Sequence, residues 1–187
     1  MIKFLFIGRV EDEKGTGRVI EIAHHLQARG IEFQIDIVGD GSKRSEYQSD
    51  ARRLMLEERS LFHGWLNKDD LKVLFQRAHF LLLPTSASEG WPKVLSEGMA
   101  YGVVPLAGAV SSIPQILNDF HTGKALDPFD LSSFVRAIQG YLANPQQWQA
   151  ESMAGLQAAE RFTYEHYLQQ VRDMLNEAWG INLSLRD

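Results

Sequence analysis

The sequence predicts an α/β protein with a parallel sheet, on two observations. Short apolar runs alternate along the chain with longer segments of helical periodicity, which is typical of parallel strands connected by helices. Polar loops follow most of these runs, and open α/β sheets bind ligands at the carboxyl ends of their strands. With 187 residues, 44% of them hydrophobic, the chain has the size of one domain. The expected fold class is therefore a Rossmann-like, doubly wound parallel sheet followed by C-terminal helices.

The first half of the chain contains three predicted strands, at residues 4–7, 33–38 and 61–65. The first connection is a helix that ends before Gly30. Its apolar side chains recur at helical spacing and are Val19, Ile22, Ala23 and Leu26. The second connection is a polar, charged helix over residues 45–58.

The second half continues the alternation. A helix capped by Asp69 leads to a fourth strand at residues 79–83, and further strands are expected at 103–106 and 123–126. Proline is frequent in the first turn of a helix, so a helix is predicted to begin near Pro92.

Three helices are expected after the last strand. The second of them follows Pro145. The first and third carry apolar stripes, which are expected to belong to the core. These stripes are Leu131, Phe134, Val135, Ile138 and Leu142 in the first helix, and Tyr164, Tyr167, Leu168, Val171, Leu175 and Ala178 in the third.

Composition excludes several classes of function. A formal net charge of -5 argues against a broad surface for nucleic acid or an anionic membrane. The chain has no cysteine, which excludes disulfides and cysteine-ligated metals. The apolar runs fall short of a membrane span, and the first residues lack the pattern of a signal peptide. A cytoplasmic protein is expected.

The turn Gly39-Asp40-Gly41 after the second strand invites comparison with dinucleotide-binding loops. Those loops need a third glycine three residues after the second, and Arg44 stands there instead. A dehydrogenase is therefore not supported. Gly39 belongs either to a turn beside a nucleotide or to a plain connecting turn.

The stretch from Ser86 to Ala100 carries the strongest functional signal. It is predicted to be a polar loop that ends at a helix N-terminus near Pro92. Unpaired N–H groups and the helix dipole attract an anion such as phosphate there. Glu89 and Glu97 are predicted to face one pocket, and because carboxylates repel phosphate they fit better as acceptors for neighbouring hydroxyl groups. This combination favours a sugar nucleotide as ligand.

Glu89 and Glu97, separated by Gly-Trp-Pro-Lys-Val-Leu-Ser, resemble the paired-glutamate motif of retaining, nucleotide-sugar-dependent GT-B glycosyltransferases of the group 1 or family 4 class. Three further segments are similar to that family in the same order. They are Phe6-Ile7-Gly8-Arg9 with Lys14-Gly15, residues 38–41, and residues 110–117. The four motifs span nearly the whole chain and argue against a chance match.

The resemblance implies a donor site for a nucleoside-diphosphate sugar. In it Arg9 and Lys14 grip the diphosphate, Glu97 binds the ribose hydroxyls and Glu89 holds hydroxyls of the sugar near the reacting carbon. Backbone N–H groups from residues 90–94 assist. Glu89, Arg9 and Lys14 are the expected catalytic residues. The other expected donor-binding positions are Gly8, Gly39, Gly64, Gly90, Trp91, Pro92, Lys93, Val94 and Glu97.

Each role has a plain structural alternative. Arg9 and Lys14 fit a solvated charged loop. Glu97 fits an exposed helical glutamate paired with Lys93 four residues earlier, and Glu89 fits a solvated loop acid.

The sequence departs from the family after the fifth strand. Ser111-Ser112 replaces the usual glycine pair, and Gln115 replaces the usual glutamate after proline. These departures bear on how closely the backbone approaches the donor at this point, and they leave Glu89 and Glu97 as the clearer pair.

Residues 1–187 are thus expected to form a single donor-binding domain, one half of a GT-B fold. The N-terminal acceptor-binding domain of the family has no match in this sequence. Because the first strand begins close to Met1, we expect a part of a longer protein or a separate subunit. The resemblance also implies that the last helix crosses back toward the other domain, which places Trp179 at a surface that is normally covered.

The expected activity is retaining transfer of a sugar from a nucleoside diphosphate to a glycan or lipid-linked saccharide, as in lipopolysaccharide or exopolysaccharide synthesis. The isolated chain is expected to be inactive without the acceptor domain. No metal and no other cofactor is expected, since cations of the protein cover the diphosphate. Peripheral association of the full enzyme with the inner face of the membrane is a further implication.

Two alternatives belong to other classes. The chain fits a non-catalytic nucleotide-sugar-binding module or the donor subunit of a split transferase, which would bind ligand without turnover. It also fits an unrelated Rossmann-like interaction module, in which the glutamate pair is incidental and no nucleotide binds.

Overall fold

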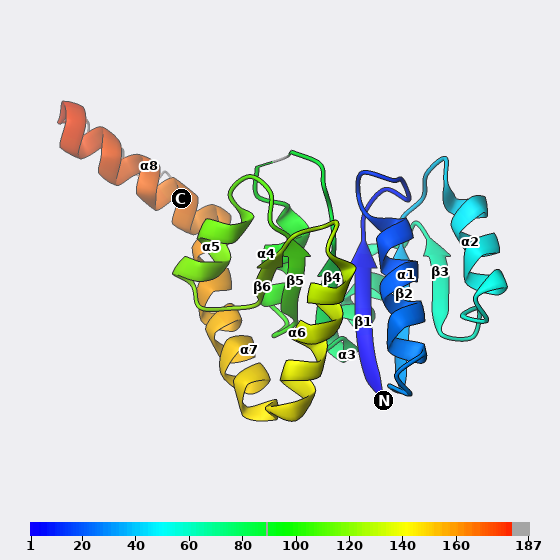
Figure 1. The fold of residues 1–187 in the computed structure, drawn as a ribbon. Coiled ribbons are helices and arrows are strands. Elements are labelled where there is room, and N and C mark those ends of the chain that lie inside the picture. The colour runs from blue at the N-terminus through cyan, green and yellow to red at the C-terminus, as the bar shows by residue number, and fades with distance from the viewer. Residues whose placement is uncertain (89, 181–187) are drawn as a thin grey trace.

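The computed structural model describes residues 1–88 and 90–180 and contains a six-stranded parallel sheet between helices (Figure 1). The strands are β1 (Ile2–Ile7), β2 (Phe33–Val38), β3 (Ser60–Gly64), β4 (Phe80–Leu83), β5 (Val104–Gly108) and β6 (Lys124–Leu126). Their order is β3-β2-β1-β4-β5-β6, and each neighbouring pair is parallel. The predicted Rossmann-like fold class is confirmed.

The helices cover both faces of the sheet. They are α1 (Thr16–Gln27), α2 (Arg44–Arg53), α3 (Lys68–Arg77), α4 (Lys93–Met99), α5 (Ile113–Asp119), α6 (Leu131–Ala143), α7 (Pro145–Ala159), the short 3₁₀ helix η1 (Glu160–Phe162) and α8 (Tyr164–Trp179). Helix α1 packs against α2 and α6 on one face (Figure 1). Right-handed crossovers bring α3 and α4 to the opposite face, where α4 packs against α7.

The core follows the central strands. Residues 4–6 of β1 are buried, as is all of β4, because helices cover both sides of these strands. Phe4 stacks on Phe80 with 5.6 Å between ring centroids and meets Phe33 edge-on at 6.3 Å. These contacts join β1, β2 and β4 where apolar runs were predicted.

The strand order reverses between β1 and β4. The chain moves outward from β1 through β2 to β3, then returns to place β4 on the other side of β1. The loops after β1 and β4 therefore lie side by side at a topological switch point. In open α/β sheets this crevice is where ligands bind.

Some predicted boundaries were wrong. The cap of α3 is Asn67 rather than Asp69, because the Asn67 side chain accepts a hydrogen bond of 2.9 Å from the Asp70 amide. Helix α2 ends at Arg53 rather than near residue 58, since Met55 takes a left-handed conformation with φ 55° and buried Leu56 anchors the turn. The helix start near Pro92 is confirmed, with Pro92 at the N-cap of α4.

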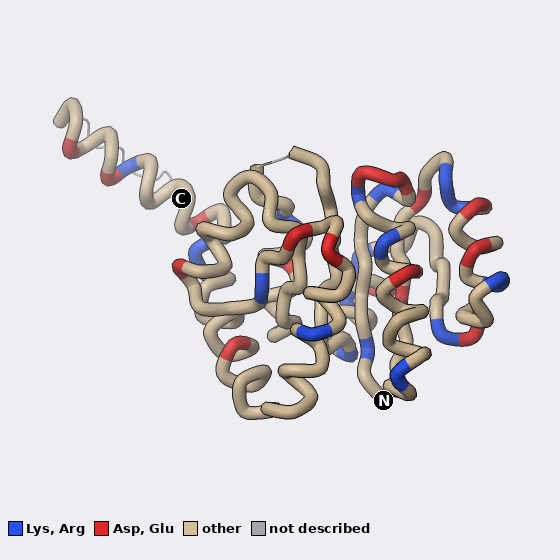
Figure 2. Tube along the Cα trace, in the orientation of Figure 1, with Lys and Arg blue, Asp and Glu red and all other residues tan. Residues whose placement is uncertain are grey.

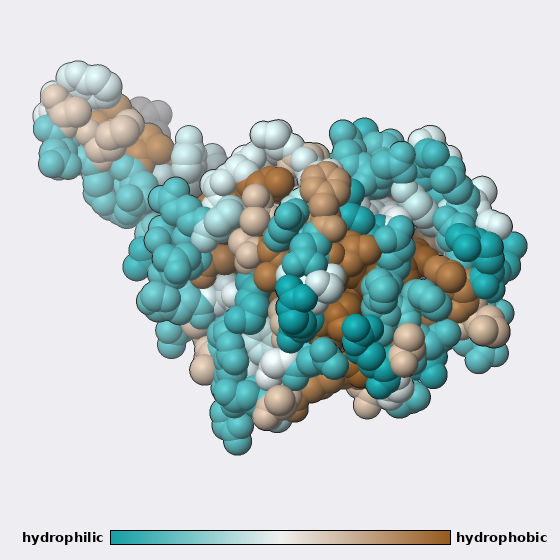
Figure 3. All heavy atoms as spheres, viewed as in Figure 1, coloured by the Kyte–Doolittle hydropathy of each residue, from teal (hydrophilic) through white to brown (hydrophobic). Residues whose placement is uncertain are grey.

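The expected core role of the last helix was also wrong. No residue of α8 is buried, and Tyr164 and Tyr167 are 70% and 61% exposed. Helix α8 projects from the domain, and hydrophobic residues line part of its surface (Figures 1 and 3). An apolar stripe predicts that one face of a helix packs against another surface, but it does not identify that surface. In α6, Phe134 and Ile138 are buried as predicted, whereas Leu142 is 42% exposed.

The helices of the described part are too short or too polar to cross a bilayer.

Candidate functional site

A cavity of about 270 Å³ opens at the switch point, between the carboxyl ends of β1 and β4. Leu83 and Ile7, the last residues of those strands, form its apolar part. The rest of its lining consists of residues predicted for the donor site: Gly8, Arg9, Lys14, Pro92, Lys93 and Val94. The structure thus brings together residues that lie about 80 positions apart in the sequence.

The charged side chains among the described lining residues are all cationic. Arg9 and Lys14 come from the loop between β1 and α1, and Lys93 is the first residue of α4. The amides of Lys93 and Val94 open α4, before the first amide with a helical acceptor, that of Leu95, which donates to the Pro92 carbonyl oxygen at 3.0 Å. An anionic group of phosphate size fits this combination of charge and shape.

Carboxylates of its own loop hold Arg9. Its guanidinium lies 3.2 Å from Glu11 and 3.3 Å from Glu13, and its side chain is 57% exposed. Figure 2 shows these acidic positions gathered in the loop that follows β1. Exposed ion pairs of this kind are weak, each about 0.2–1 kcal/mol, so an incoming anion competes with them at small cost.

The two loops around the cavity contact one another directly. The amide of Ser86 donates a hydrogen bond of 2.9 Å to the Glu13 carbonyl oxygen, and the Thr85 hydroxyl donates another of 3.2 Å. At Gly15, with φ +89°, a Cβ atom would lie 2.3 Å from the Pro84 carbonyl oxygen. Only glycine allows this approach of the two backbones.

Sequence reasoning missed two residues that anchor the β1–α1 loop. Arg18 of α1 donates to carbonyl oxygens of both loops, and burial lowers the pKa of its guanidinium. Tyr47 of α2 donates a hydrogen bond from its hydroxyl to the Asp12 carboxylate, and burial with this contact raises the pKa of Tyr47. The Arg18 partners Pro84 and Ser86 lie 66 and 68 positions away, so no local pattern pointed to them.

Glu97 lines a separate cavity of about 300 Å³ between α3 and α4. The other lining residues are Lys68, Leu71, Lys72, Phe75, Ala100 and Tyr101. Within the described residues no ion pair joins Glu97 to Lys93. Glu89 lies outside the described residues, so the shared pocket of Glu89 and Glu97 stays a prediction.

Trp91 packs toward the C-terminal segment. Its ring stacks on Phe162 of η1 with 5.3 Å between centroids and 15° between planes, and its Nε1 donates a hydrogen bond of 2.5 Å to Ser96 Oγ. Phe120 meets Phe162 edge-on at 5.7 Å. Beside Trp91, Gly90 has open space where a side chain would lie. The predicted donor contact of Trp91 is therefore restricted to its backbone unless the ring leaves this stack.

Gly39 and Gly64 lie at the ends of the neighbouring strands β2 and β3 and do not line the switch-point cavity. The Gly39 amide donates a hydrogen bond of 2.8 Å to the Gly64 carbonyl oxygen. A Cβ on Gly64 would lie 3.0 Å from the guanidinium of Arg44, which pairs with Asp40 at 3.4 Å.

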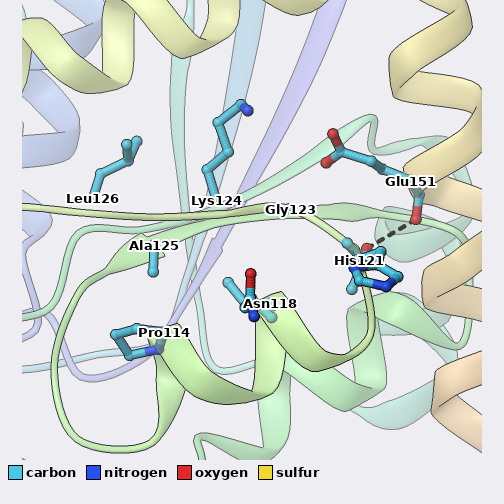
Figure 4. Close-up of a pocket in the computed structure, with 10 residues that line it drawn as sticks. Pro114, Asn118, His121, Gly123, Lys124, Ala125, Leu126 and Glu151 are labelled. Atoms are coloured by element: carbon cyan, nitrogen blue, oxygen red, sulfur yellow. Dashed lines mark hydrogen bonds between the residues drawn. The ribbon is translucent and has the colours of Figure 1, made fainter.

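A larger cavity of about 530 Å³ lies beside the edge strand β6, between α5 and α7 (Figure 4). Its charged groups already have protein partners. The Glu151 carboxylate accepts hydrogen bonds from Tyr141 and Gln147, and the Lys124 ammonium lies 5.3 Å from the centre of the Tyr141 ring. The Thr122 hydroxyl donates to the Glu151 carbonyl oxygen (Figure 4). None of the predicted site residues lines this cavity.

Among the described residues, no cluster of three or more histidine, aspartate or glutamate side chains is placed to hold a metal ion. The expectation that no metal is needed stays a prediction.

Comparisons with a family model and with known proteins indicate the same family. The family model described as "Glycosyl transferases group 1" matches residues 2–161. A lipopolysaccharide 1,6-galactosyltransferase of Salmonella typhimurium is 30% identical over 162 residues, which cover 85% of this chain and 44% of that protein. This chain therefore spans less than half the length of that relative.

Two solved structures share the fold. Anabaena HepE in complex with UDP superimposes with a TM-score of 0.81 at 19% identity, over 94% of this chain and 49% of that one. The C-terminal domain of the group 1 glycosyl transferase LpcC from Francisella tularensis superimposes with a TM-score of 0.75 at 16% identity, over 85% of this chain and 84% of that one.

Proposed function

The chain belongs to the group 1 glycosyl transferases, and from this premise we propose that it is the donor-binding domain of a retaining glycosyltransferase. In this proposal the full protein moves a sugar from a nucleoside diphosphate to a glycan or lipid-linked saccharide. The observation that carries the proposal is the cationic cavity at the switch point, where Arg9, Lys14 and the start of α4 converge.

Arg9 and Lys14 act on the diphosphate. When the bond at the anomeric carbon breaks, negative charge builds on the departing diphosphate, and positive charge already fixed at that place lowers the barrier. Lys93 and the first N–H groups of α4 add to this field. The retaining outcome rests on the family resemblance of the Glu89 motif, with Glu89 holding hydroxyls of the sugar.

Glu97 is proposed to bind the ribose. It lines the cavity between α3 and α4 and does not line the switch-point cavity, whose lining includes the start of the same helix. A carboxylate outside the phosphate site suits hydroxyl groups, since it avoids repulsion by the phosphates. UDP is the first nucleotide to test, because the HepE structure holds UDP.

The acceptor is proposed to bind in a further domain of the full protein. Two findings support this. The chain spans 44% of its galactosyltransferase relative, and the described part of the chain leaves an apolar face of the projecting helix α8 exposed, with Met174 55% and Trp179 67% exposed. We propose that this face packs against the acceptor domain and that the chain is inactive alone. We further propose that the full enzyme is cytoplasmic and contacts the membrane peripherally. It is proposed to need no metal and no other cofactor.

Calorimetric titration with UDP, GDP and ADP tests the donor-binding role. The expected result is binding of one nucleotide with a Kd of about 10 µM to 1 mM, or roughly -4 to -7 kcal/mol. Arg9→Ala and Glu97→Ala are each expected to weaken binding by about tenfold or more, because each removes a charged hydrogen-bonding group. Arg53→Ala is the matched control, since Arg53 lies on α2, is 69% exposed and pairs with Asp50 on the same helix.

Equal affinity of Arg9→Ala and wild type would contradict the diphosphate site. Binding without turnover, in the presence of the acceptor domain and an acceptor, would favour the non-catalytic module or the split subunit instead.

A further inference from the structure

The side chain of Arg18 joins the two loops that border the switch-point cavity. On the β4–α4 side, its Nε donates a hydrogen bond of 2.7 Å to the Pro84 carbonyl oxygen, and its Nη2 lies 3.1 Å from Ser86 Oγ. On the β1–α1 side, the same Nη2 donates to the carbonyl oxygens of Asp12 and Glu13, both at 3.1 Å. One guanidinium thus binds both loops.

The planar fork of arginine suits this position. Its N–H groups have fixed directions, so Nε and Nη2 reach acceptors on separate segments at the same time. A lysine carries the same charge on a single nitrogen and cannot copy that geometry. The contacts therefore depend on the shape of the group as well as on its charge.

An aromatic ring from a third loop also contacts the guanidinium of Arg18. Its guanidinium carbon lies 5.3 Å from the centre of the Phe129 ring, which belongs to the loop between β6 and α6. Thr16, the first residue of α1, is buried. Arg18 is half-buried and does not line the cavity, so it is placed behind the loops rather than among the groups that face a ligand.

We propose that Arg18 is a positioning residue of the donor site. It fixes the β1–α1 loop against the β4–α4 loop, so that Arg9, Lys14 and the first residues of α4 face one diphosphate. This inference rests on the proposed function, because the relative placement of the loops matters to catalysis only if the cavity binds the donor.

A direct reporter of this placement exists in the structure. The Ser86 amide donates a hydrogen bond of 2.9 Å to the Glu13 carbonyl oxygen, and this bond crosses between the two loops. Without the Arg18 contacts the loops separate more often, and the Ser86 amide exchanges its hydrogen with solvent more rapidly.

The test uses Arg18→Ala, Arg18→Lys and the control Arg29→Ala. Arg29 follows the C-terminal end of α1, opposite the end that carries Arg18, and its side chain donates to the His25 carbonyl oxygen at 2.9 Å. Amide exchange of Ser86 is measured by NMR without ligand, and UDP affinity is measured by calorimetry. We expect exchange about tenfold faster in both Arg18 variants and UDP affinity about fivefold to thirtyfold lower, with Arg29→Ala equal to wild type.

The lysine variant separates positioning from charge. If Arg18→Lys binds UDP as tightly as wild type, the charge alone matters and the positioning role is overturned. Unchanged Ser86 exchange with unchanged UDP affinity in both variants also overturns it. If wild type binds none of UDP, GDP and ADP, the proposed function fails and the donor-site role of Arg18 fails with it. Should Arg18→Ala not fold, Arg18→Lys alone still decides between these results.

Discussion

A Cβ atom on Gly39 would lie 2.0 Å from the carbonyl oxygen of Gly8. Gly39 has φ +121°, and it directly follows β2, as Gly8 directly follows β1. Because no side chain fits between these backbones, Gly39 brings the β2 loop against the β1 loop that carries Arg9. The placement of the cationic loop therefore depends on a glycine that does not line the cavity itself.

Gly39→Ala is expected to destabilise the protein far more than Gly30→Ala. Both positions have positive φ, and this backbone conformation costs a residue with a Cβ roughly 1–2 kcal/mol. Gly30 has nothing within 4 Å of the added atom, so its substitution is expected to cost no more than that. Gly39→Ala must also displace the Gly8 carbonyl. Urea unfolding of both variants measures the difference, and equal losses would contradict the close approach.

Glu13→Gln is expected to raise the affinity for a nucleoside diphosphate by about 1.5-fold to fivefold. The substitution removes one of the carboxylates that pair with Arg9, at 3.3 Å, so less interaction is lost when Arg9 turns to the ligand. The pair is exposed, which keeps the effect small and sensitive to salt. Calorimetry at low ionic strength measures it.

Glu32→Gln provides the charge-matched control, since Glu32 is 71% exposed and pairs with Arg59 before β2. The same gain in both variants would mean that net charge, rather than the Arg9 pair, sets the affinity.

His79 is expected to make stability fall in mild acid. Burial lowers the pKa of His79, and its Nδ1 accepts a hydrogen bond of 3.1 Å from the Lys3 amide, which requires an unprotonated nitrogen. Because the folded pKa is lower than the unfolded value of about 6.5, the unfolded chain binds more protons in the interval between them. The contribution to stability is thus present above about pH 6.5 and lost as the pH falls through the folded pKa.

His79→Asn keeps an acceptor without the titration. The free energy of unfolding of wild type relative to this variant is expected to decrease between about pH 7.5 and about pH 5.5. All other ionisable groups are common to the two proteins, so the difference isolates position 79. A pH-independent difference would contradict the role of His79.

Trp91 and Phe162 are expected to be energetically coupled. Their rings stack at 5.3 Å, and such aromatic pairs contribute about 0.5–1.5 kcal/mol beyond their burial. A double-mutant cycle with Trp91→Ala and Phe162→Ala, followed by urea unfolding, measures this coupling. Trp65→Ala is the control, since Trp65 is 75% exposed and its combination with Phe162→Ala should be additive. If the losses of unfolding free energy for Trp91→Ala and Phe162→Ala were also additive, the stacked rings would contribute no coupling energy.

Local patterns predicted the sheet well. The apolar runs around Phe4, Ile35 and Leu81 are buried on both faces in parallel strands, and a run of that kind has few other structures to adopt. Of the residues that the family motifs indicated, those from the β1–α1 loop and the start of α4 line one cavity, whereas Gly39, Gly64 and Glu97 do not line it. Their roles in binding stay predictions. The family assignment excludes the unrelated interaction module that the sequence left open.

What the sequence did not predict depends on contacts between distant segments. Arg18 looks like an ordinary helical arginine until Pro84 and Ser86 are placed beside it. The stripe of α8 was expected in the core because its period is helical, yet the described part of the chain leaves Tyr164 and Tyr167 exposed. Glu97 and the Arg9 loop line different cavities, and the spacing of these residues in the sequence did not indicate that there are two.

The location of the donor site is the central claim, and NMR titration of the labelled protein with UDP tests it most directly. The largest amide shifts are expected around the switch-point cavity, at residues 8–9, 14 and 93–94, with smaller shifts near Glu97. Shifts centred on residues 118–126, beside the larger cavity at β6, would contradict the claim. So would the absence of shifts with UDP, GDP and ADP alike.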